Sequence, residues 1–156
     1  MKAIETEYNG ILFRSRLEAR WAILFDALKI EWVYEPECFL LSNNQKYTPD
    51  FYIPFFDLYV EVKPTFFWQN IDYHSNRYNI FEKNLLILSD DYPSFRVNKL
   101  YQYVDGEKFI NNVVFCPNHK YEPFFYSGYE LGSIEDEFDE DYVDELNKVK
   151  QHRFYK

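Results

Sequence analysis

Apolar and polar residues follow helical spacing in one early stretch of the chain, SRLEARWAILFDALKI, residues 15–30. Its large apolar side chains recur every three or four positions: Leu17, Trp21, Leu24 and Leu28. Ser15 followed by Glu18 matches a capping box, in which each residue satisfies a backbone N–H of the other. The pattern predicts a helix over about Arg16 to Leu28.

Shorter apolar runs with strand-like alternation flank this helix. Ala3 to Tyr8 and Ile11 to Arg14 surround Asn9-Gly10, a pair that accepts the positive φ of a tight hairpin turn. Further strands are predicted at Ile30–Tyr34, Cys38–Leu41, Tyr47–Ile53, Leu58–Lys63, Asn84–Leu88, Val113–Cys116 and Glu122–Tyr126. The last two would form a hairpin.

The remaining segments complete the predicted order. Residues Phe67 to Phe81 predict a second helix, and Glu135 to Lys150 an acidic helix or a partly ordered arm. One mixed β-sheet flanked by α-helices, an α/β or α+β fold, accommodates this order. We expect one domain over residues 1–129, followed by the acidic segment 130–156.

The run YTPDFYIPFFDLYVEVKP, residues 47–64, carries three charged residues within its two predicted strands: Asp50, Glu61 and Lys63. A further charged residue, Asp57, lies in the connection between those strands. Strand alternation puts Glu61 and Lys63 on one face, opposite Leu58, Val60 and Val62. If the two predicted strands pair as neighbours, Asp50 approaches Glu61. Two close carboxylates repel unless a proton or a cation lies between them. Mg²⁺, which prefers oxygen ligands, is the expected occupant, and phosphodiester hydrolysis the expected reaction.

Glu18 is the fourth charged candidate. It lies beside the apolar stripe of the predicted helix, since seven residues separate it from Phe25 and nearly complete two turns. A carboxylate on that side points toward the sheet and could join the site. The alternative is that Glu18 serves only the capping box with Ser15, and the two roles are compatible.

These residues resemble the PD-(D/E)XK nuclease superfamily, whose members share a restriction-endonuclease-like core. The likeness lies in FRSRLEARWAILFDALKIEWVYEPE followed by YTPDFYIPFFDLYVEVKP, with ten residues between Asp50 and Glu61. It is greatest to small phage, viral and mobile-element nucleases related to Holliday-junction resolvases and transposon end-cleaving enzymes.

The resemblance implies specific roles for the four charged residues. Mg²⁺ or Mn²⁺ would be bound by Asp50, Glu61 and the backbone carbonyl of Val62, with Glu18 as an accessory ligand. Lys63 would be the catalytic cation, and cleavage would leave a 5′-phosphate. DNA is the favoured substrate, and a homodimer would allow concerted cuts in both strands.

Other residues are candidates for contacting the nucleic acid: Arg14, Arg16, Arg20, Gln69, His74, Arg77 and Tyr78. The arginines around the helix start could instead pair with nearby acids. The residues after position 67 could equally form a solvated helix face. A zinc site built around Cys116 and His119 is a further alternative, although CxxH supplies only half of a tetrahedral set.

The negative charge of the chain weakens the prediction that it binds nucleic acid. The formal net charge is −9, but residues 1–129 carry −4 and residues 130–156 carry −5. The sequence shows no apolar run of membrane-spanning length and no signal-peptide pattern, so we expect an intracellular, cytoplasmic protein, encoded by a phage or virus if the resemblance holds. Two alternatives remain: a non-catalytic module with a nuclease fold that binds nucleic-acid ends or junctions, or an acidic inhibitor protein.

Overall fold

A seven-stranded sheet is the centre of the computed structural model, which describes residues 3–64, 77–89, 97–116, 124–127 and 148–149. Its strands are β3 (Val33–Tyr34), β6 (Phe51–Ile53), β7 (Leu58–Lys63), β8 (Leu85–Ser89), β9 (Val97–Val104), β10 (Glu107–Cys116) and β11 (Phe124–Ser127). They lie in the order β11-β10-β9-β8-β7-β6-β3. Neighbours are antiparallel except β7 and β8, which are parallel. The sheet is therefore mixed, and the fold is α+β, as the sequence predicts.

The helix α1 (Arg16–Ala27) begins at the predicted residue. The Glu18 N–H donates to the Ser15 hydroxyl over 3.1 Å, and the Ser15 N–H donates to Glu18 Oε2 over 2.8 Å. The capping box is thus present at the start of α1. Leu28, the last residue of the predicted helix, is the C-cap.

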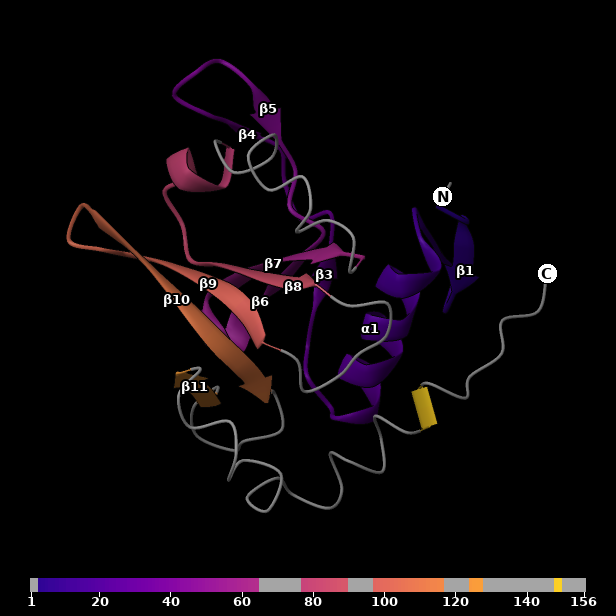
Figure 1. Cartoon of the computed structure of the whole chain (residues 1–156). Coiled ribbons are helices and arrows are strands. Elements are labelled where there is room, and N and C mark those ends of the chain that lie inside the picture. Colours follow the sequence, from indigo (N-terminus) through magenta and orange to yellow (C-terminus); the bar gives the residue numbers. More distant parts are fainter. Residues whose placement is uncertain (1–2, 65–76, 90–96, 117–123, 128–147, 150–156) are drawn as a thin grey trace.

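Two small hairpins accompany the sheet (Figure 1). The strands β1 (Thr6–Tyr8) and β2 (Ile11–Phe13) form the first, and its turn has φ of 51° at Asn9 and 78° at Gly10. This confirms the hairpin predicted from Asn9-Gly10. The strands β4 (Phe39–Leu40) and β5 (Lys46–Tyr47) form the second hairpin, which projects from the sheet.

The two faces of the sheet bury separate hydrophobic clusters. Leu58, Val60 and Val62 pack on the face covered by α1, together with apolar residues of that helix. Tyr59 packs on the other face, with residues of the β4–β5 hairpin and of the segment before β8. The alternation predicted along β7 is therefore confirmed, and Glu61 and Lys63 belong to the face opposite α1.

The segment Tyr47–Ile53, predicted as one strand, is divided in two. Tyr47 ends β5 and pairs with Phe39, whereas Phe51 begins β6 and pairs with Val60. Pro49 lies between them and has no N–H to donate to a strand ladder. The chain therefore changes partners at this proline, and Asp50 lies just before β6.

The second half of the chain departs further from the sequence prediction. The whole of β9 and the first part of β10 were not predicted, although β10 and β11 do form the predicted hairpin. Residues 77–80, within the predicted second helix, are helical, and the rest of that prediction falls largely outside the described residues. The acidic segment 130–156 is described only at residues 148–149, which are helical.

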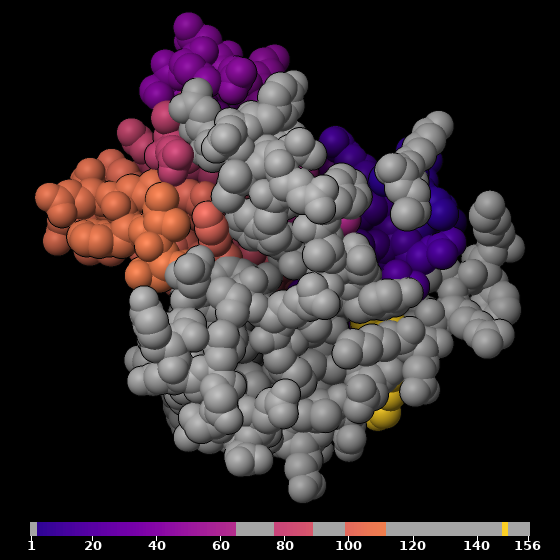
Figure 2. Space-filling model, viewed as in Figure 1, coloured from indigo at the N-terminus to yellow at the C-terminus, as the bar shows by residue number. Residues whose placement is uncertain are grey.

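Two hairpin tips are exposed at the periphery of the molecule (Figure 2). Leu40 in the β4–β5 hairpin is 70% exposed, and Phe109 in the β9–β10 hairpin is 48% exposed. Within the described residues, no helix is long and apolar enough to cross a membrane.

Replacing Phe25 by Ala should destabilise the protein by about 3–5 kcal/mol, the usual cost of truncating a fully buried aromatic side chain. Phe25 is completely buried and packs against Trp21 and the edge of Phe51, with ring centroids 5.8 and 5.6 Å away. Leu12, which is 59% exposed, provides the control, and Leu12→Ala should change stability by no more than about 0.5 kcal/mol. Urea unfolding measures both. Equal losses for the two variants would contradict the assigned core.

Candidate active site

The pairing of β6 with β7 brings Asp50 beside Glu61. Phe51 pairs with Val60, so the antiparallel register continued by one position sets Asp50 opposite Glu61. The Val62 N–H donates to Asp50 Oδ2 over 2.8 Å. The Glu35 N–H donates to the Asp50 carbonyl, also over 2.8 Å. Asp50 is thus fixed to β7 by its side chain and to the segment after β3 by its backbone.

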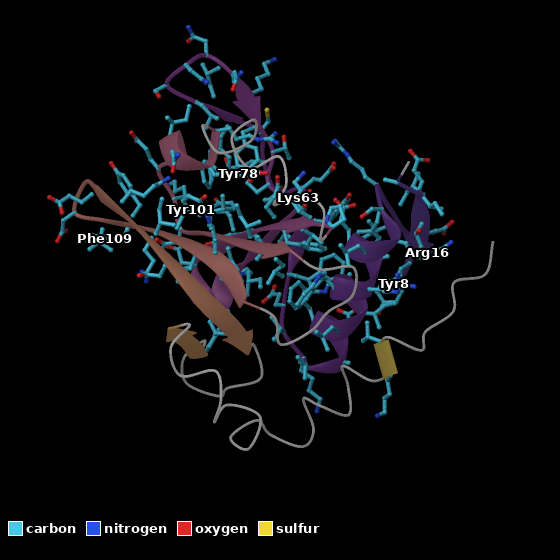
Figure 3. The ribbon with its side chains drawn as sticks, in the orientation of Figure 1. Tyr8, Arg16, Lys63, Tyr78, Tyr101 and Phe109 are labelled. Carbon is cyan, nitrogen blue, oxygen red and sulfur yellow. The ribbon has the colours of Figure 1, made fainter. Side chains whose placement is uncertain are left out.

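Glu61 lies near the middle of the sheet, and the residue is 3% exposed. Its Oε2 accepts a hydrogen bond from the Tyr78 hydroxyl over 3.2 Å. The same oxygen lies 3.7 Å from the Lys63 ammonium nitrogen. Figure 3 shows Tyr78 and Lys63 on the side of the sheet that carries the β4–β5 hairpin. A cationic and a neutral donor therefore converge on one buried carboxylate.

Glu18 contributes a third carboxylate from the first turn of α1 and is 5% exposed. Its Oε2 accepts from the Ser15 N–H and from the Tyr34 hydroxyl, the latter over 3.3 Å. Its charge also reaches Asp50, where it raises the pKa of that carboxyl. The capping role and a position beside the candidate site are therefore both present.

Electrostatic repulsion between these acids changes the pKa of Asp50. Burial raises the pKa of the Asp50 carboxyl well above its usual value, and the charges of Glu61 and Glu18 raise it further. The hydrogen bond from the Val62 N–H acts in the opposite direction. The deprotonated site therefore concentrates negative charge that a proton or a bound cation would relieve.

The available donors fit a hard divalent cation. Carboxylate oxygens of Asp50 and Glu61 and the carbonyl of Val62 are the ligand type that Mg²⁺ and Mn²⁺ prefer. Mg²⁺ is commonly bound through one or two carboxylates and several waters, and the Asp50–Glu61 pair meets that requirement. Among the described residues, no group of three or more His, Cys, Asp or Glu side chains meets the spacing of a metal site by itself.

The candidate nucleic-acid contacts fall in different surroundings. The exposed side chain of Arg14 pairs with Glu35, Nε to Oε1 over 2.6 Å, which matches the alternative of local ion pairing. Arg16 and Arg20 lie in the first two turns of α1 and are partly buried. Gln69 and His74 lie outside the described residues. Arg16 lies beside the β1–β2 hairpin in the view of Figure 3, apart from Lys63.

Tyr78 and Arg77 lie next to the carboxylates rather than on an open helix face. Tyr78 is 1% exposed, so its ring offers almost no surface on which a base could stack. The Arg77 guanidinium carbon lies 5.3 Å from the ring centre of Tyr47 and 5.2 Å from that of Tyr78. Sequence reasoning did not single out Tyr34 or Tyr47. The only sequence signal for Tyr47 is its place three residues before Asp50.

No family model matches the chain, and no curated protein matches it significantly.

Metal-free protein should lose stability as the pH rises from about 4 towards neutrality, and Asp50→Asn should reduce that loss. The folded-state pKa of Asp50 is raised above the ordinary value of 3.8. Between these two pKa values the folded protein holds a proton that the unfolded chain has released, so its stabilisation is lost as the pH rises through the folded pKa. Denaturant unfolding across this pH range, with a chelator present, measures the effect.

Asp105→Asn is the matched control, because Asp105 is exposed in the β9–β10 turn. Its pH dependence should equal that of the wild type. If Asp50→Asn also followed the wild-type curve, the assigned repulsion between Asp50, Glu61 and Glu18 would be wrong.

Proposed function

We propose that this protein is a metal-dependent nuclease with a restriction-endonuclease-like core of the PD-(D/E)XK type. The observation that carries the proposal is the pairing of Phe51 with Val60, since this register continued by one position sets Asp50 opposite Glu61. The Lys63 ammonium lies 3.7 Å from Glu61. Structural ion pairs balance opposite charges. Here, among the described residues, the charges of Glu18 and Glu61 both act on Asp50, while the one lysine shown nearby, Lys63, pairs with Glu61. Such an excess of acid over base is typical of a site that accepts a further cation.

The arrangement of secondary structure supports the same reading. Glu61 lies on β7, an interior strand of the mixed sheet, and Asp50 lies directly before the neighbouring strand β6. The helix α1 covers the opposite face, and the charge of Glu18 in its first turn acts on Asp50. A mixed sheet flanked by a helix that carries a glutamate is what the resemblance implies for such nucleases.

Each charged residue has a defined role in the proposed reaction. Asp50, Glu61 and the Val62 carbonyl would hold Mg²⁺ or Mn²⁺, with Glu18 as an accessory ligand or a group that orients water. When bound, such a cation would lower the pKa of a water and would polarise a phosphoryl oxygen. The Lys63 ammonium orients that water or offsets the charge that develops on the phosphate. Hydrolysis then leaves a 5′-phosphate.

DNA is the proposed substrate class, and the nuclease is proposed to act inside the cell, in a phage, viral or mobile-element context. Arg16, Arg20 and Arg77 provide positive charge on elements that also carry site residues. A homodimer would cut both strands in one encounter. The substrate class, the cellular context and the homodimer are all proposed from the resemblance to small PD-(D/E)XK nucleases.

With Mg²⁺ or Mn²⁺, the wild-type protein should cleave at least one substrate in a panel of linear, supercoiled, flap and four-way-junction DNA and one RNA. Glu61→Gln and Lys63→Met should each lower the cleavage rate constant by roughly 100-fold or more, since each removes a charge that acts on the transition state. Gel-based single-turnover rates measure the loss, and a chelator should abolish cleavage.

Two exposed residues supply matched controls for these substitutions. Glu107→Gln in the β9–β10 hairpin and Lys46→Met in β5 should retain the wild-type rate. Salt-dependent binding of nucleic acid without cleavage of any substrate would favour the non-catalytic module. Cleavage by Glu61→Gln at the wild-type rate would remove Glu61 from the mechanism.

The two roles of Glu18 should separate in a pair of variants. Ser15→Ala removes the hydroxyl that caps α1 and should cost about 1 kcal/mol of stability while leaving the cleavage rate largely unchanged. Glu18→Gln keeps an oxygen for the Ser15 N–H but removes the charge, so it should lower the rate while largely preserving stability. Urea unfolding and single-turnover cleavage measure the two effects. A Glu18→Gln variant that loses stability and keeps its rate would assign Glu18 to the cap alone.

A further inference from the structure

We propose that Tyr47 and Tyr78 are positioning residues for the divalent cation, an inference that rests on the proposed metal-dependent function. Tyr78 holds Glu61 by a direct hydrogen bond, and the Tyr47 hydroxyl hydrogen-bonds to the hydration shell of a cation bound at Asp50 and Glu61. Neither tyrosine reacts with the substrate.

Tyr47 is a buried residue whose hydroxyl is unsatisfied. The residue is 2% exposed, and its ring packs edge-on against Phe81 and Tyr78, with centroids 5.1 and 6.0 Å away. Within the described part of the chain, its buried hydroxyl has no hydrogen-bond partner. A buried hydroxyl left unpaired is destabilising, so native proteins rarely retain one without a ligand or a water to bind.

The hydroxyl of Tyr47 lies within electrostatic reach of the carboxylates. After burial, the charge of Glu61 is the largest cause that raises the pKa of Tyr47, and Asp50 contributes as well. The ring stands on the same face of the sheet as Tyr59, the face to which Glu61 belongs. At 2% exposure, Tyr47 is too enclosed for a nucleotide to reach, whereas a water molecule needs only a small polar space with two or more partners.

Tyr78 is held more firmly and contacts Glu61 itself. Its hydroxyl donates to Glu61 Oε2 over 3.2 Å. The Lys108 ammonium, from β10, donates to the Tyr78 carbonyl over 2.6 Å and to the Phe81 carbonyl. The backbone around Tyr78 is therefore tied to β10 at two carbonyls by one ammonium, and the Tyr78 hydroxyl holds Glu61 Oε2 in one orientation.

Arg77 joins the two tyrosines into one unit. Its guanidinium lies over both rings at 5.3 and 5.2 Å, a separation at which a cation is attracted to an aromatic face. Phenylalanine would fill both ring positions with the same packing, without the unpaired hydroxyl of Tyr47 and without the hydroxyl that Tyr78 donates to Glu61. The hydroxyls are thus the part of these side chains that packing does not explain.

The test compares Mn²⁺ affinity of the full-length wild type with that of Tyr47→Phe and Tyr78→Phe, by isothermal titration calorimetry at neutral pH without nucleic acid. Each substitution should weaken Mn²⁺ binding by roughly 10-fold or more, as loss of an outer hydrogen-bond partner usually does. Tyr59→Phe is the control, because the Tyr59 hydroxyl belongs to the same cluster but donates to Glu37 over 3.2 Å. It should keep the wild-type affinity.

Stability of the metal-free variants distinguishes a positioning role from a structural one. Tyr47→Phe should unfold at the same or a higher temperature than the wild type, because it removes an unpaired buried hydroxyl. The proposal for Tyr47 would be overturned if Tyr47→Phe bound Mn²⁺ with wild-type affinity or failed to fold. The proposal for Tyr78 would be overturned if Tyr78→Phe bound Mn²⁺ with wild-type affinity. Absence of Mn²⁺ binding by the wild type would overturn the cation site as well. If the wild type bound Mn²⁺ normally but cleaved no substrate, the proposed nuclease function would be wrong, and the positioning roles of the two tyrosines would stand.

Discussion

The burial of Glu61 in the interior strand β7 is the constraint on which the rest of the site depends. β7 is buried from Leu58 to Val62, and an ionised carboxylate in such surroundings is costly unless it is paired and hydrogen-bonded. Tyr78 and Lys63 supply a hydrogen bond and a nearby positive charge, but the neighbouring acids Asp50 and Glu18 add repulsion. A fold that only needed stability would gain by replacing one of these acids. Their retention is consistent with a site whose charge is completed by a ligand.

Asp50 reaches this site because the chain breaks its strand at Pro49. Residues before the proline pair within the β4–β5 hairpin, and residues after it pair with β7. At the junction, the Asp50 carboxylate accepts a hydrogen bond from the Val62 N–H, and the Asp50 carbonyl accepts one from the Glu35 N–H. Backbone hydrogen bonds that an uninterrupted strand would use are thus redirected to hold one acidic side chain. The proline fixes the position of the acid as much as it limits the strand.

Local signals predicted a large part of this arrangement. The alternation along Leu58–Lys63 gave the correct faces of β7, and Ser15 with Glu18 gave the start of α1. The approach of Asp50 to Glu61 followed from pairing of adjacent strands. These features depend on residues close in sequence, where hydrophobic period and capping chemistry are decisive.

Features that depend on distant contacts were not predicted. Asp105-Gly106 joins β9 to β10 with positive φ at both residues, the same turn signal as Asn9-Gly10. The two flanking strands were nevertheless not predicted, because polar and apolar residues are mixed along them. Tyr78 was expected on an accessible helix face, and its place under Glu61 depends on how the connection between β7 and β8 packs. The Tyr47 hydroxyl has no local signal, because its surroundings come from three separate segments.

The parallel pairing of β7 with β8 also bears on the order in which the protein folds. β6 and β7 are joined by the short 3₁₀ turn Pro54–Phe56, so the pair that carries Asp50 and Glu61 closes through local contacts. Pairing Val60 with Leu86 requires a longer loop to close, with a larger loss of chain entropy. Tyr78 lies in that loop. Pairing of β6 with β7 therefore does not depend on the segment that carries Tyr78, so the two acids can come together before the Tyr78 hydroxyl reaches Glu61.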